Sequence, residues 1–359
     1  MRVKLEDVCE RGSSNIKQSD IIKMSGNYPI YGASGLAGKV NFYHQEQPYV
    51  AVVKDGAGIG RTTLNPAKSS VIGTMQYLIP KKNVLPEYLF YAVSYMHLEK
   101  YYTGATIPHI YFKDYKNEEF NLDNIEKQLE IIDVLGRCKK VIEARKQELV
   151  ELDRLMKARF VEMFGDPVSN SYGFPEATLP ELGELGRGVS KHRPRNDSKL
   201  LGGDYPLIQT GDVANAGLYI ISYGGTYSEL GLKQSKMWNK GTLCITIAAN
   251  IAKTAILEFD ACFPDSVVGF IANEKTNNIF IHYWFSFFQA ILESQAPESA
   301  QKNINLKILS ELKVIVPKKE KQDEFVEFIE QVYKSKVAVQ KALDETQILF
   351  DSLMQKYFG

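Results

Sequence analysis

The stretch "NIEKQLEIIDVLGRCKKVIEARKQELVELDRLMKARFVEMFG", residues 124–165, decides how this chain is organised. Its apolar residues recur at steps of three and four, the spacing of a helix with one apolar stripe. Gly165 and Pro167 follow the stripe, and such a pair ends a helix because glycine adopts the left-handed cap and proline cannot continue the hydrogen-bond ladder. The pattern predicts one helix over 123–165, on the order of 50 to 60 Å long.

The last part of the chain, residues 318–359, repeats this pattern and also ends on a similar tripeptide, YFG against MFG. An apolar stripe of this length must be covered in water. We therefore expect the two helices to pair antiparallel, as a two-helix coiled coil. The predicted seam consists of Leu129, Ile132, Leu135, Ile142, Leu149, Leu152, Met156, Val332, Val339, Leu343, Phe350 and Leu353.

The segments before the two helices also resemble each other, which indicates an internal duplication. "YPIYGASG" from Tyr28 matches "YPLIQTGD" from Tyr205, and "SSVIG" ending at Gly73 matches "DSVVG" ending at Gly269. The offset between the copies grows along the chain, so the second copy carries an insertion of roughly twenty residues, which we place between Tyr205 and Val267. The duplication predicts a globular domain over 1–122 and a second over 166–317, each followed by its long helix.

Composition excludes several classes of protein. The four cysteines are scattered without a C-x-x-C or a Cys/His cluster, which argues against zinc and against a disulfide framework. The segment "MRVKLEDVCERG" carries charges where a signal peptide needs an apolar core, and no segment reads as a membrane span, so we expect a cytoplasmic protein. Residues 1–120 hold 14 Lys and Arg against 11 Asp and Glu, and residues 166–316 hold 13 against 15. Any contact with DNA must therefore come from local basic clusters.

The glycine-rich turn in "YVAVVKDGAGIGRTT", residues 49–63, raises the question of a nucleotide-binding loop. Gly56, Gly58 and Gly60 have the spacing of neither a P-loop nor a dinucleotide fingerprint. The corresponding stretch of the second half, "CITIAANIAKTA", has Ala and Asn instead of these glycines. We therefore expect a strand, a tight turn and another strand in each half. A methyltransferase cofactor loop built from Asp55 to Gly60 stays open as an alternative.

Taken in order and in duplicate, these motifs resemble the specificity (S) subunits of type I restriction-modification systems. The likeness covers nearly the whole chain. It rests on "YPIYGASGLAGKVNFY", "PYVAVVKDGAGIG", "GATIPHI" and "EKQLEIIDVL" in the first half, and on "SKHRPRND", "YPLIQTGDV", "GTLCITIAANIAKTAIL", "CFPDSVVGF" and "KEKQDEFVEFI" in the second. It implies an α+β chain in which two pseudo-symmetric DNA-recognition domains are separated by the antiparallel coiled coil.

The resemblance also implies a non-catalytic subunit whose domains each read one half of a bipartite sequence in double-stranded DNA. The helices would set the spacing of the halves and dock two methyltransferase (modification) subunits, which methylate adenine at N6, with motor-nuclease restriction subunits joining them. No cofactor or metal is then expected in this chain, because S-adenosylmethionine, ATP and Mg belong to the partner subunits.

For DNA contact we expect three groups of residues. Arginine can bridge phosphates or reach guanine, amides suit adenine, and a carboxylate can accept from cytosine. The groups are the basic loop Lys191, His192, Arg193 and Arg195; the turns after Tyr28 and Tyr205, with Ser34, Lys39, Gln209, Thr210 and Asp212; and the two compared hairpins, with Lys54, Arg61, Asn250 and Lys253.

Two other functions compete with DNA reading. A self-contained DNA methyltransferase would use the Asp55–Gly60 loop, but N6-adenine enzymes carry an (Asp/Asn)-Pro-Pro-aromatic motif to hold the flipped base. The chain contains no Pro-Pro dipeptide. A pure assembly adaptor would bind only proteins and would leave no protected DNA sequence.

Overall fold

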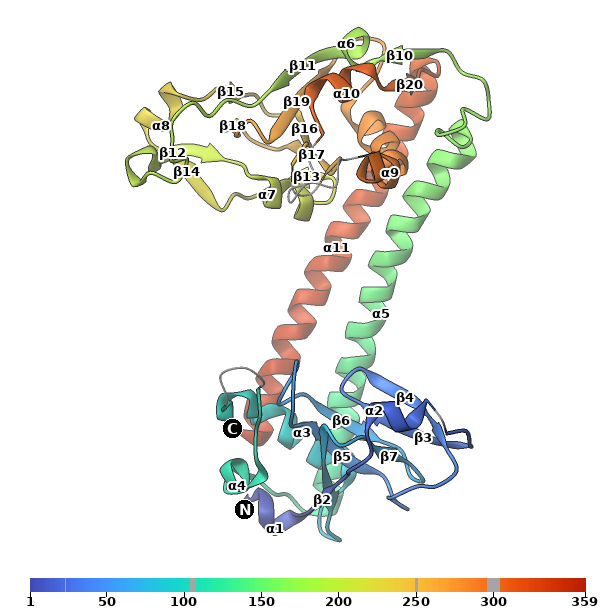
Figure 1. Ribbon diagram of the computed structural model, residues 1–359, viewed down its shortest axis with the longest axis vertical. Helices are drawn as coiled ribbons and strands as arrows, with labels where there is room; N and C mark the ends of the chain where they lie inside the picture. The colour runs from blue at the N-terminus through green and yellow to red at the C-terminus, as the bar shows by residue number, and fades with distance from the viewer. Residues whose placement is uncertain (23, 104–107, 249–250, 296–303) are drawn as a thin grey trace. The chain divides into compact units, whose positions relative to one another are not determined.

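The computed structural model describes residues 1–22, 24–103, 108–248, 251–295 and 304–359 (Figure 1). The chain forms two compact units. The first unit comprises Met1–Glu148 and Val339–Gly359, and the second comprises Leu149–Ala338. Two long helices, α5 (Ile125–Phe164) and α11 (Lys319–Phe358), each give one segment to each unit. Each unit is therefore a globular domain combined with parts of both helices.

The ends of α5 are fixed by local chemistry. Asn124 precedes the helix, and its Oδ1 accepts a hydrogen bond from the N–H of Lys127 at 2.9 Å. This bond satisfies one of the N–H groups that have no partner inside the first turn. After the last turn, Gly165 adopts a φ of +71°, the left-handed conformation that closes a helix at little cost for glycine.

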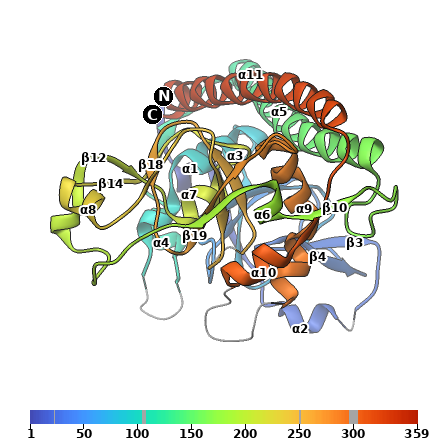
Figure 2. The same cartoon turned by 90° about the horizontal axis from the view of Figure 1, so that it is seen from above.

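Within each unit, the segments of α5 and α11 run antiparallel, as the sequence predicts, and lie side by side in both Figure 1 and Figure 2. In the second unit, Lys336 Nζ lies 2.5 Å from Asp153 Oδ1, and Arg159 Nη2 lies 2.9 Å from a carboxylate oxygen of Glu324. Residue numbers along α11 thus fall as those along α5 rise. In the first unit, the Arg145 guanidinium on α5 donates to the hydroxyl of a threonine on α11.

Burial along the helices corrects one residue of the predicted seam. The other predicted seam residues are buried or half-buried: Ile132, Leu135, Ile142, Leu149, Leu152, Met156, Val332, Val339, Leu343, Phe350 and Leu353. Leu129 is instead 55% exposed, and Ile131, at 1%, takes the inward position. The cause is Gln128, which is fully buried. Gln128 and Ile131 are three residues apart and so share the inward face of the helix, whereas Leu129 is turned by about 100° from Gln128 and lies on the exposed side.

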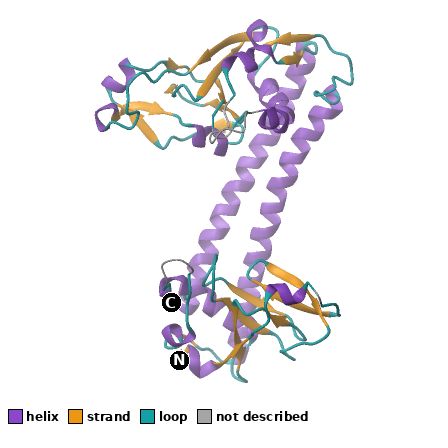
Figure 3. Ribbon diagram, viewed as in Figure 1, coloured by secondary structure: helices purple, strands orange, loops and turns teal. Residues whose placement is uncertain are grey.

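Small sheets form the globular part of the first unit (Figure 3). One sheet has the order β2-β8-β5-β6 and another β4-β3-β7, while β1 pairs with β9. Strand β5 is buried along its whole length, so it forms the centre of the core. The strands are β1 (Arg2–Lys4), β2 (Cys9–Ser13), β3 (Tyr28–Gly32), β4 (Gly35–Val40), β5 (Tyr49–Val53), β6 (Thr62–Asn65), β7 (Ser70–Val71), β8 (Met75–Pro80) and β9 (Glu119–Asn121). The short helices are α1 (Leu5–Val8), α2 (Gln18–Ile21), α3 (Pro86–Tyr95), η1 (Leu98–Tyr101) and α4 (Phe112–Tyr115).

The second unit has the sheets β11-β19-β16-β17-β13 and β14-β12-β18-β15, and the pair β10-β20. Its core includes both tryptophans of the chain, Trp238 and Trp284. The strands are β10 (Glu176–Thr178), β11 (Gly183–Arg187), β12 (Leu201–Leu207), β13 (Tyr219–Ile220), β14 (Gly225–Tyr227), β15 (Met237–Trp238), β16 (Leu243–Thr246), β17 (Thr254–Leu257), β18 (Ala261–Cys262), β19 (Val267–Ala272) and β20 (Lys313–Ile315). The helices are α6 (Leu179–Leu182), η2 (Ser198–Leu200), α7 (Thr210–Asn215), α8 (Glu229–Lys233), α9 (Asn278–Gln295) and α10 (Leu306–Glu311).

The duplication read from the sequence is present in the strand order. The series β2-β8-β5-β6 corresponds to β11-β19-β16-β17, and β4-β3-β7 corresponds to β14-β12-β18. The insertion lies within the predicted interval. Only residues 33–34 separate β3 from β4, whereas residues 208–224, with α7 and β13, separate β12 from β14. The extra residues of the second copy thus add the edge strand β13 to the larger sheet, next to β17.

A buried glutamine connects each long helix to the domain before it. Gln128 accepts from the N–H of Leu85 at 2.9 Å and donates to the carbonyls of Asn83 and Asp123 at 3.0 and 2.8 Å. In the other copy, Gln322 accepts from the Thr276 hydroxyl and donates to the carbonyls of Lys275 and Pro317. Both side chains are fully buried. The repeated Glu-Lys-Gln motif is therefore a structural joint between helix and domain.

Candidate nucleic-acid interface

The predicted basic loop of the second unit has a defined backbone conformation. We call residues 187–199, which run from the end of β11 into η2, the arginine loop. The Gln234 side-chain oxygen accepts hydrogen bonds from the N–H groups of Lys191 and His192, at 2.7 and 3.0 Å. The Ser235 hydroxyl donates to the carbonyl of Val189 at 2.8 Å. The segment after α8 therefore holds the backbone of the loop and leaves its basic side chains unconstrained by these bonds.

The far side of the loop is held by Asp197. Its Oδ1 accepts from the N–H of Lys199 at 3.0 Å, and its Oδ2 lies 3.1 Å from Nε2 of His192. These contacts, the backbone bond first, hold the pKa of Asp197 below its ordinary value of 3.8. His192 is thereby drawn into a contact within the loop, while Lys191 stays exposed.

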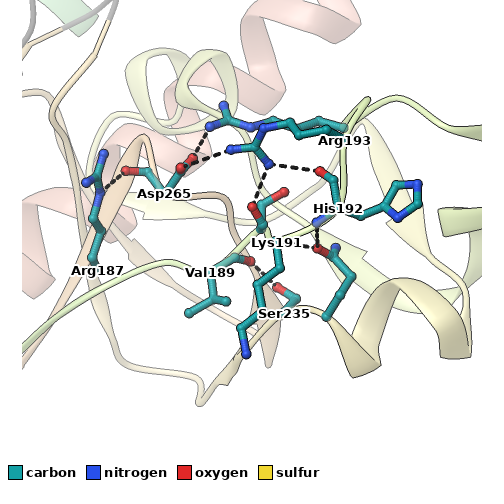
Figure 4. A network of polar contacts seen from close by, with 10 residues as sticks. Arg187, Val189, Lys191, His192, Arg193, Ser235 and Asp265 are labelled. Carbon is teal, nitrogen blue, oxygen red and sulfur yellow. Dashed lines mark hydrogen bonds and ion pairs between the residues drawn. The ribbon is translucent and has the colours of Figure 1, made fainter.

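Three arginines of the loop converge on one acidic residue, Asp265, and Figure 4 labels two of them, Arg187 and Arg193. Asp265 lies between β18 and β19, and its carboxylate accepts from Arg195 and lies 3.5 Å from Nη2 of Arg193. The backbone carbonyl of Asp265 accepts from Nε of Arg187. The side chains of Arg193 and Arg195 keep 56% and 45% of their surface exposed. The guanidinium groups are thus both fixed in place and accessible.

One hollow of about 320 Å³ brings the arginine loop near other candidate residues. Arg195, Gln209 and Thr210 line it together with Ser266. Two of the three predicted groups, the arginine loop and the turn before α7, therefore meet at this hollow. Guanidinium, amide and hydroxyl groups are the side chains that contact phosphates and base edges.

Asp212 also has a structural role. Its Oδ2 accepts from the N–H of Gln209 at 2.8 Å, which caps the start of α7. One oxygen of the carboxylate expected to accept a bond from cytosine is thus engaged in the helix cap, and the contact with cytosine stays a prediction.

In the first unit, the structure brings together two of the predicted residues at one pair of turns. The guanidinium of Arg61, after the glycine-rich turn, donates to the carbonyl of Ala33 in the β3–β4 turn at 3.0 Å. Ser34 is the exposed next residue of that turn and lines a cavity of about 520 Å³ with Asp55. Lys39 lies on β4 and does not line this cavity.

Of the two predicted residues of the second hairpin, Asn250 and Lys253, the structure describes Lys253, which does not join the arginine loop. Lys253 lines a separate cavity of about 350 Å³ in the second unit, whose other lysines, Lys157 and Lys336, come from the long helices. No residue of the arginine loop lines that cavity. Asn250 lies outside the described residues.

The glycine-rich turn does not have the context of a cofactor loop. It joins β5 to β6, which are antiparallel neighbours, and no helix follows it. Gly56, Gly58 and Gly60 all have positive φ, so they serve the turn itself. Asp55 is paired with His109 Nδ1 at 2.6 Å and with the adjacent Lys54 Nζ at 3.4 Å. Its carboxylate therefore has partners within the domain, and Lys54 is half-buried beside it.

Sequence reasoning missed Asp265 and Gln234, the residues that position the arginine loop. Asp265 stands in "DSVVG" opposite Ser69 in "SSVIG" of the first copy, and this change from a hydroxyl to a carboxylate was the available signal. Gln234 lies between α8 and β15, outside the motifs that the two copies share, so the comparison within the chain did not single it out.

The described part of the chain contains no group of three or more His, Cys, Asp or Glu side chains able to hold a metal ion. Among the helices described, none is long and apolar enough to cross a membrane.

Comparison with known proteins matches nearly the whole chain. The family model "Type I restriction modification DNA specificity domain" matches residues 1–154 and 176–346. The crystal structure of a type I restriction-modification system S subunit from M. genitalium is similar over 100% of this chain and 96% of its own, with a TM-score of 0.65 at 16% identity. A chain from a structure described as the basis of "complex assembly and conformational transition of the type I R-M system" covers 99% of this chain and 97% of its own, with a TM-score of 0.58 at 15% identity. At these identities the structural likeness concerns the fold.

Proposed function

We propose that this chain, which belongs to the type I restriction-modification DNA specificity family, reads a bipartite sequence in double-stranded DNA, one half with each domain. Two features support the division into halves. The family match falls in two segments, one in each copy of the repeat. The strand order of the two domains also corresponds, which gives each of them an equivalent set of sheet-end turns.

The observation that carries this proposal is the arginine loop with its neighbouring hollow. Arg193 and Arg195 are exposed, yet a carboxylate holds both, and Arg195 shares the hollow with Gln209 and Thr210. Binding phosphates needs exposed cations, whereas reading bases needs them held in a fixed geometry. The loop meets both needs.

The long helices provide the surface for protein partners in this proposal. Several large apolar side chains on them are exposed: Leu129, Val141, Ile348 and Leu349 in the first unit, and Val150, Leu155, Val161 and Val337 in the second. Exposed apolar side chains on a helix that is already paired favour a further protein contact. We propose that two methyltransferase subunits dock there, and that motor-nuclease restriction subunits join the complex.

Adenine methylation and DNA cleavage would then take place in the partner subunits, which would bind S-adenosylmethionine, ATP and Mg. We expect the complex to act in the cytoplasm. For this chain itself, the proposed task is selection of the site, and no observation favours the alternative cofactor loop at Asp55–Gly60.

The proposal is tested by mapping methylated adenines in the DNA of a host that expresses this chain with its modification subunits. A bipartite target with a fixed gap is the expected result. If this chain were a pure adaptor, substitutions in its two domains would leave the pattern of methylated adenines unchanged.

The role of the helices in spacing is tested by adding one heptad to each, between Glu148 and Leu149 and between Ala338 and Val339, where the two units meet in sequence. Seven residues keep the apolar seam nearly in register and add about 10 Å. Since one base pair occupies about 3.4 Å of the DNA axis, we expect the gap to lengthen by about three base pairs while both half-sites stay unchanged. Altered half-sites with an unchanged gap would contradict the ruler.

A further inference from the structure

We propose that Asp265 is a positioning residue for DNA recognition, which holds Arg193 and Arg195 in the geometry that discriminates the half-site read by the second domain. The inference rests on the proposed function and assigns the source of its specificity. Asp265 itself does not contact DNA in this proposal; it acts through the two arginines.

Backbone hydrogen bonds fix the turn that carries Asp265. The N–H of Val267 donates to the carbonyl of Pro264 at 3.0 Å, closing the turn that carries Asp265. The N–H of Gly188 donates to the carbonyl of Val267 at 2.9 Å, which joins the arginine loop to this turn. A Cβ at Gly188 would lie 2.3 Å from the Pro264 carbonyl oxygen, so only glycine permits this approach. The carboxylate is therefore presented to the arginines from a rigid base.

The two arginines differ in how many of their donors are engaged. Nη1 of Arg193 donates to the carbonyls of Ser190 and His192, at 2.6 and 2.8 Å, and its Nη2 faces Asp265. Arg195 has one bond among the described residues, from Nη2 to Asp265. A guanidinium carries five N–H groups in a fixed fork, so Arg195 keeps most of its donors for a ligand. Arg193 thus fastens the loop, and Arg195 is the reader.

Loss of the carboxylate has two opposite consequences. The charge of the surface rises by one, which strengthens binding to any DNA and steepens its salt dependence. At the same time Arg195 gains rotamer freedom, which weakens the contact that distinguishes one base pair from another. Asp265→Asn is therefore expected to tighten non-specific binding and to reduce specificity, a combination that simple damage to the interface does not produce.

The test uses the complex of this chain with its modification subunits and the target found by methylation mapping. Affinity is measured across a salt series for that duplex and for one with the second half-site scrambled. For Asp265→Asn, the ratio of the two affinities is expected to fall by about tenfold, which corresponds to loss of one good base contact. Methylation mapping should show relaxed sequence in the second half-site and an intact first half-site.

Asp204→Asn is the matched control, since it makes the same charge change at an exposed carboxylate on β12 that has no ion pair among the described residues. It should change both affinities by the same factor. Asp265→Ser is a second variant, because serine occupies the corresponding position, Ser69, of the first copy. Tryptophan fluorescence verifies that the second unit remains folded, since both tryptophans lie within it.

A double-mutant comparison identifies the route of the effect. If Asp265 acts through Arg195, adding Asp265→Asn to Arg195→Ala leaves the affinity ratio unchanged from that of Arg195→Ala alone. Asp265→Asn behaving like Asp204→Asn, or adding its full effect to Arg195→Ala, would overturn the inference. A wild-type complex without a bipartite target would instead overturn the proposed function, so the two failures are distinct.

Discussion

Replacement of Gln322 by alanine tests the joint between a long helix and its domain. The side chain is fully buried, with hydrogen bonds of 2.9 Å from the Thr276 hydroxyl and of 3.0 and 2.9 Å to the carbonyls of Lys275 and Pro317. Alanine removes all three hydrogen bonds at once and leaves their partners in place. Thr276 is only 3% exposed, so water does not readily replace the lost bond.

The expected loss follows from the polar groups left behind. A buried donor or acceptor without a partner costs about 1 to 3 kcal/mol. The Thr276 hydroxyl should lie in the upper part of that range, and the two carbonyls should add less because each keeps a second lone pair. We expect the free energy of unfolding of the second unit to fall by about 3 kcal/mol in total. At a slope of about 2 kcal/mol per M, the urea midpoint should drop by about 1.5 M.

The assay is urea denaturation followed by tryptophan fluorescence. Both tryptophans of the chain are buried in the second unit, so the signal reports on that unit. Gln331→Ala provides the control, because it makes the same substitution on an exposed part of α11 within the same unit. Its effect should stay within about 0.5 kcal/mol. Equal midpoints for the Gln322 and Gln331 variants would show that the buried glutamine is not a joint.

Two further predictions concern titratable groups whose pKa values are shifted by loss of solvent, among them the half-buried His282. Burial lowers the pKa of His282 from 6.5 to about 4, so between these values the unfolded chain binds more protons than the native state, and stability should fall by up to about 3 kcal/mol as the pH drops from about 6.5 to 4. Urea denaturation at a series of pH values checks this, and His282→Gln should remove that part of the pH dependence. Burial also raises the pKa of the Cys9 thiol to about 12 and raises those of Cys244 and Cys262, whereas Cys138 is only half-buried. A thiol reagent should therefore modify Cys138 first and the other three only on unfolding; rapid modification of all four in the native protein would contradict the burial.

The sequence predicts the parts of the fold that depend on periodicity and repetition. The spacing of Leu135, Ile142 and Met156 indicates which face of α5 is covered, and the structure buries all three. The failure at Leu129 has a physical reason, since a polar residue, Gln128, occupies the inward position. Apolar periodicity cannot anticipate a buried amide, because its burial depends on carbonyl and N–H groups brought from distant parts of the chain.

The candidate site could be predicted only in part, for the same reason. The basic residues of the arginine loop are visible in the sequence as a cluster. Their fixed geometry depends on Asp265 and Gln234, which are distant in sequence and reach the loop only through the strand order of the second unit. Which arginine is open to DNA and which is engaged in the loop is therefore a property of the tertiary structure.

The two copies of the repeat share the joint between helix and domain but differ at a corresponding turn. Gln128 and Gln322 make equivalent bonds in the two units, so the attachment of helix to domain was retained after duplication. At a corresponding turn, however, Ser69 of the first copy donates to the carbonyl of Pro66, whereas Asp265 of the second binds arginines. Changes at such turns leave the core and the joints intact, since they alter polar groups at the ends of the sheets. One scaffold can thus present two different surfaces, which suits the proposed reading of one half-site by each domain.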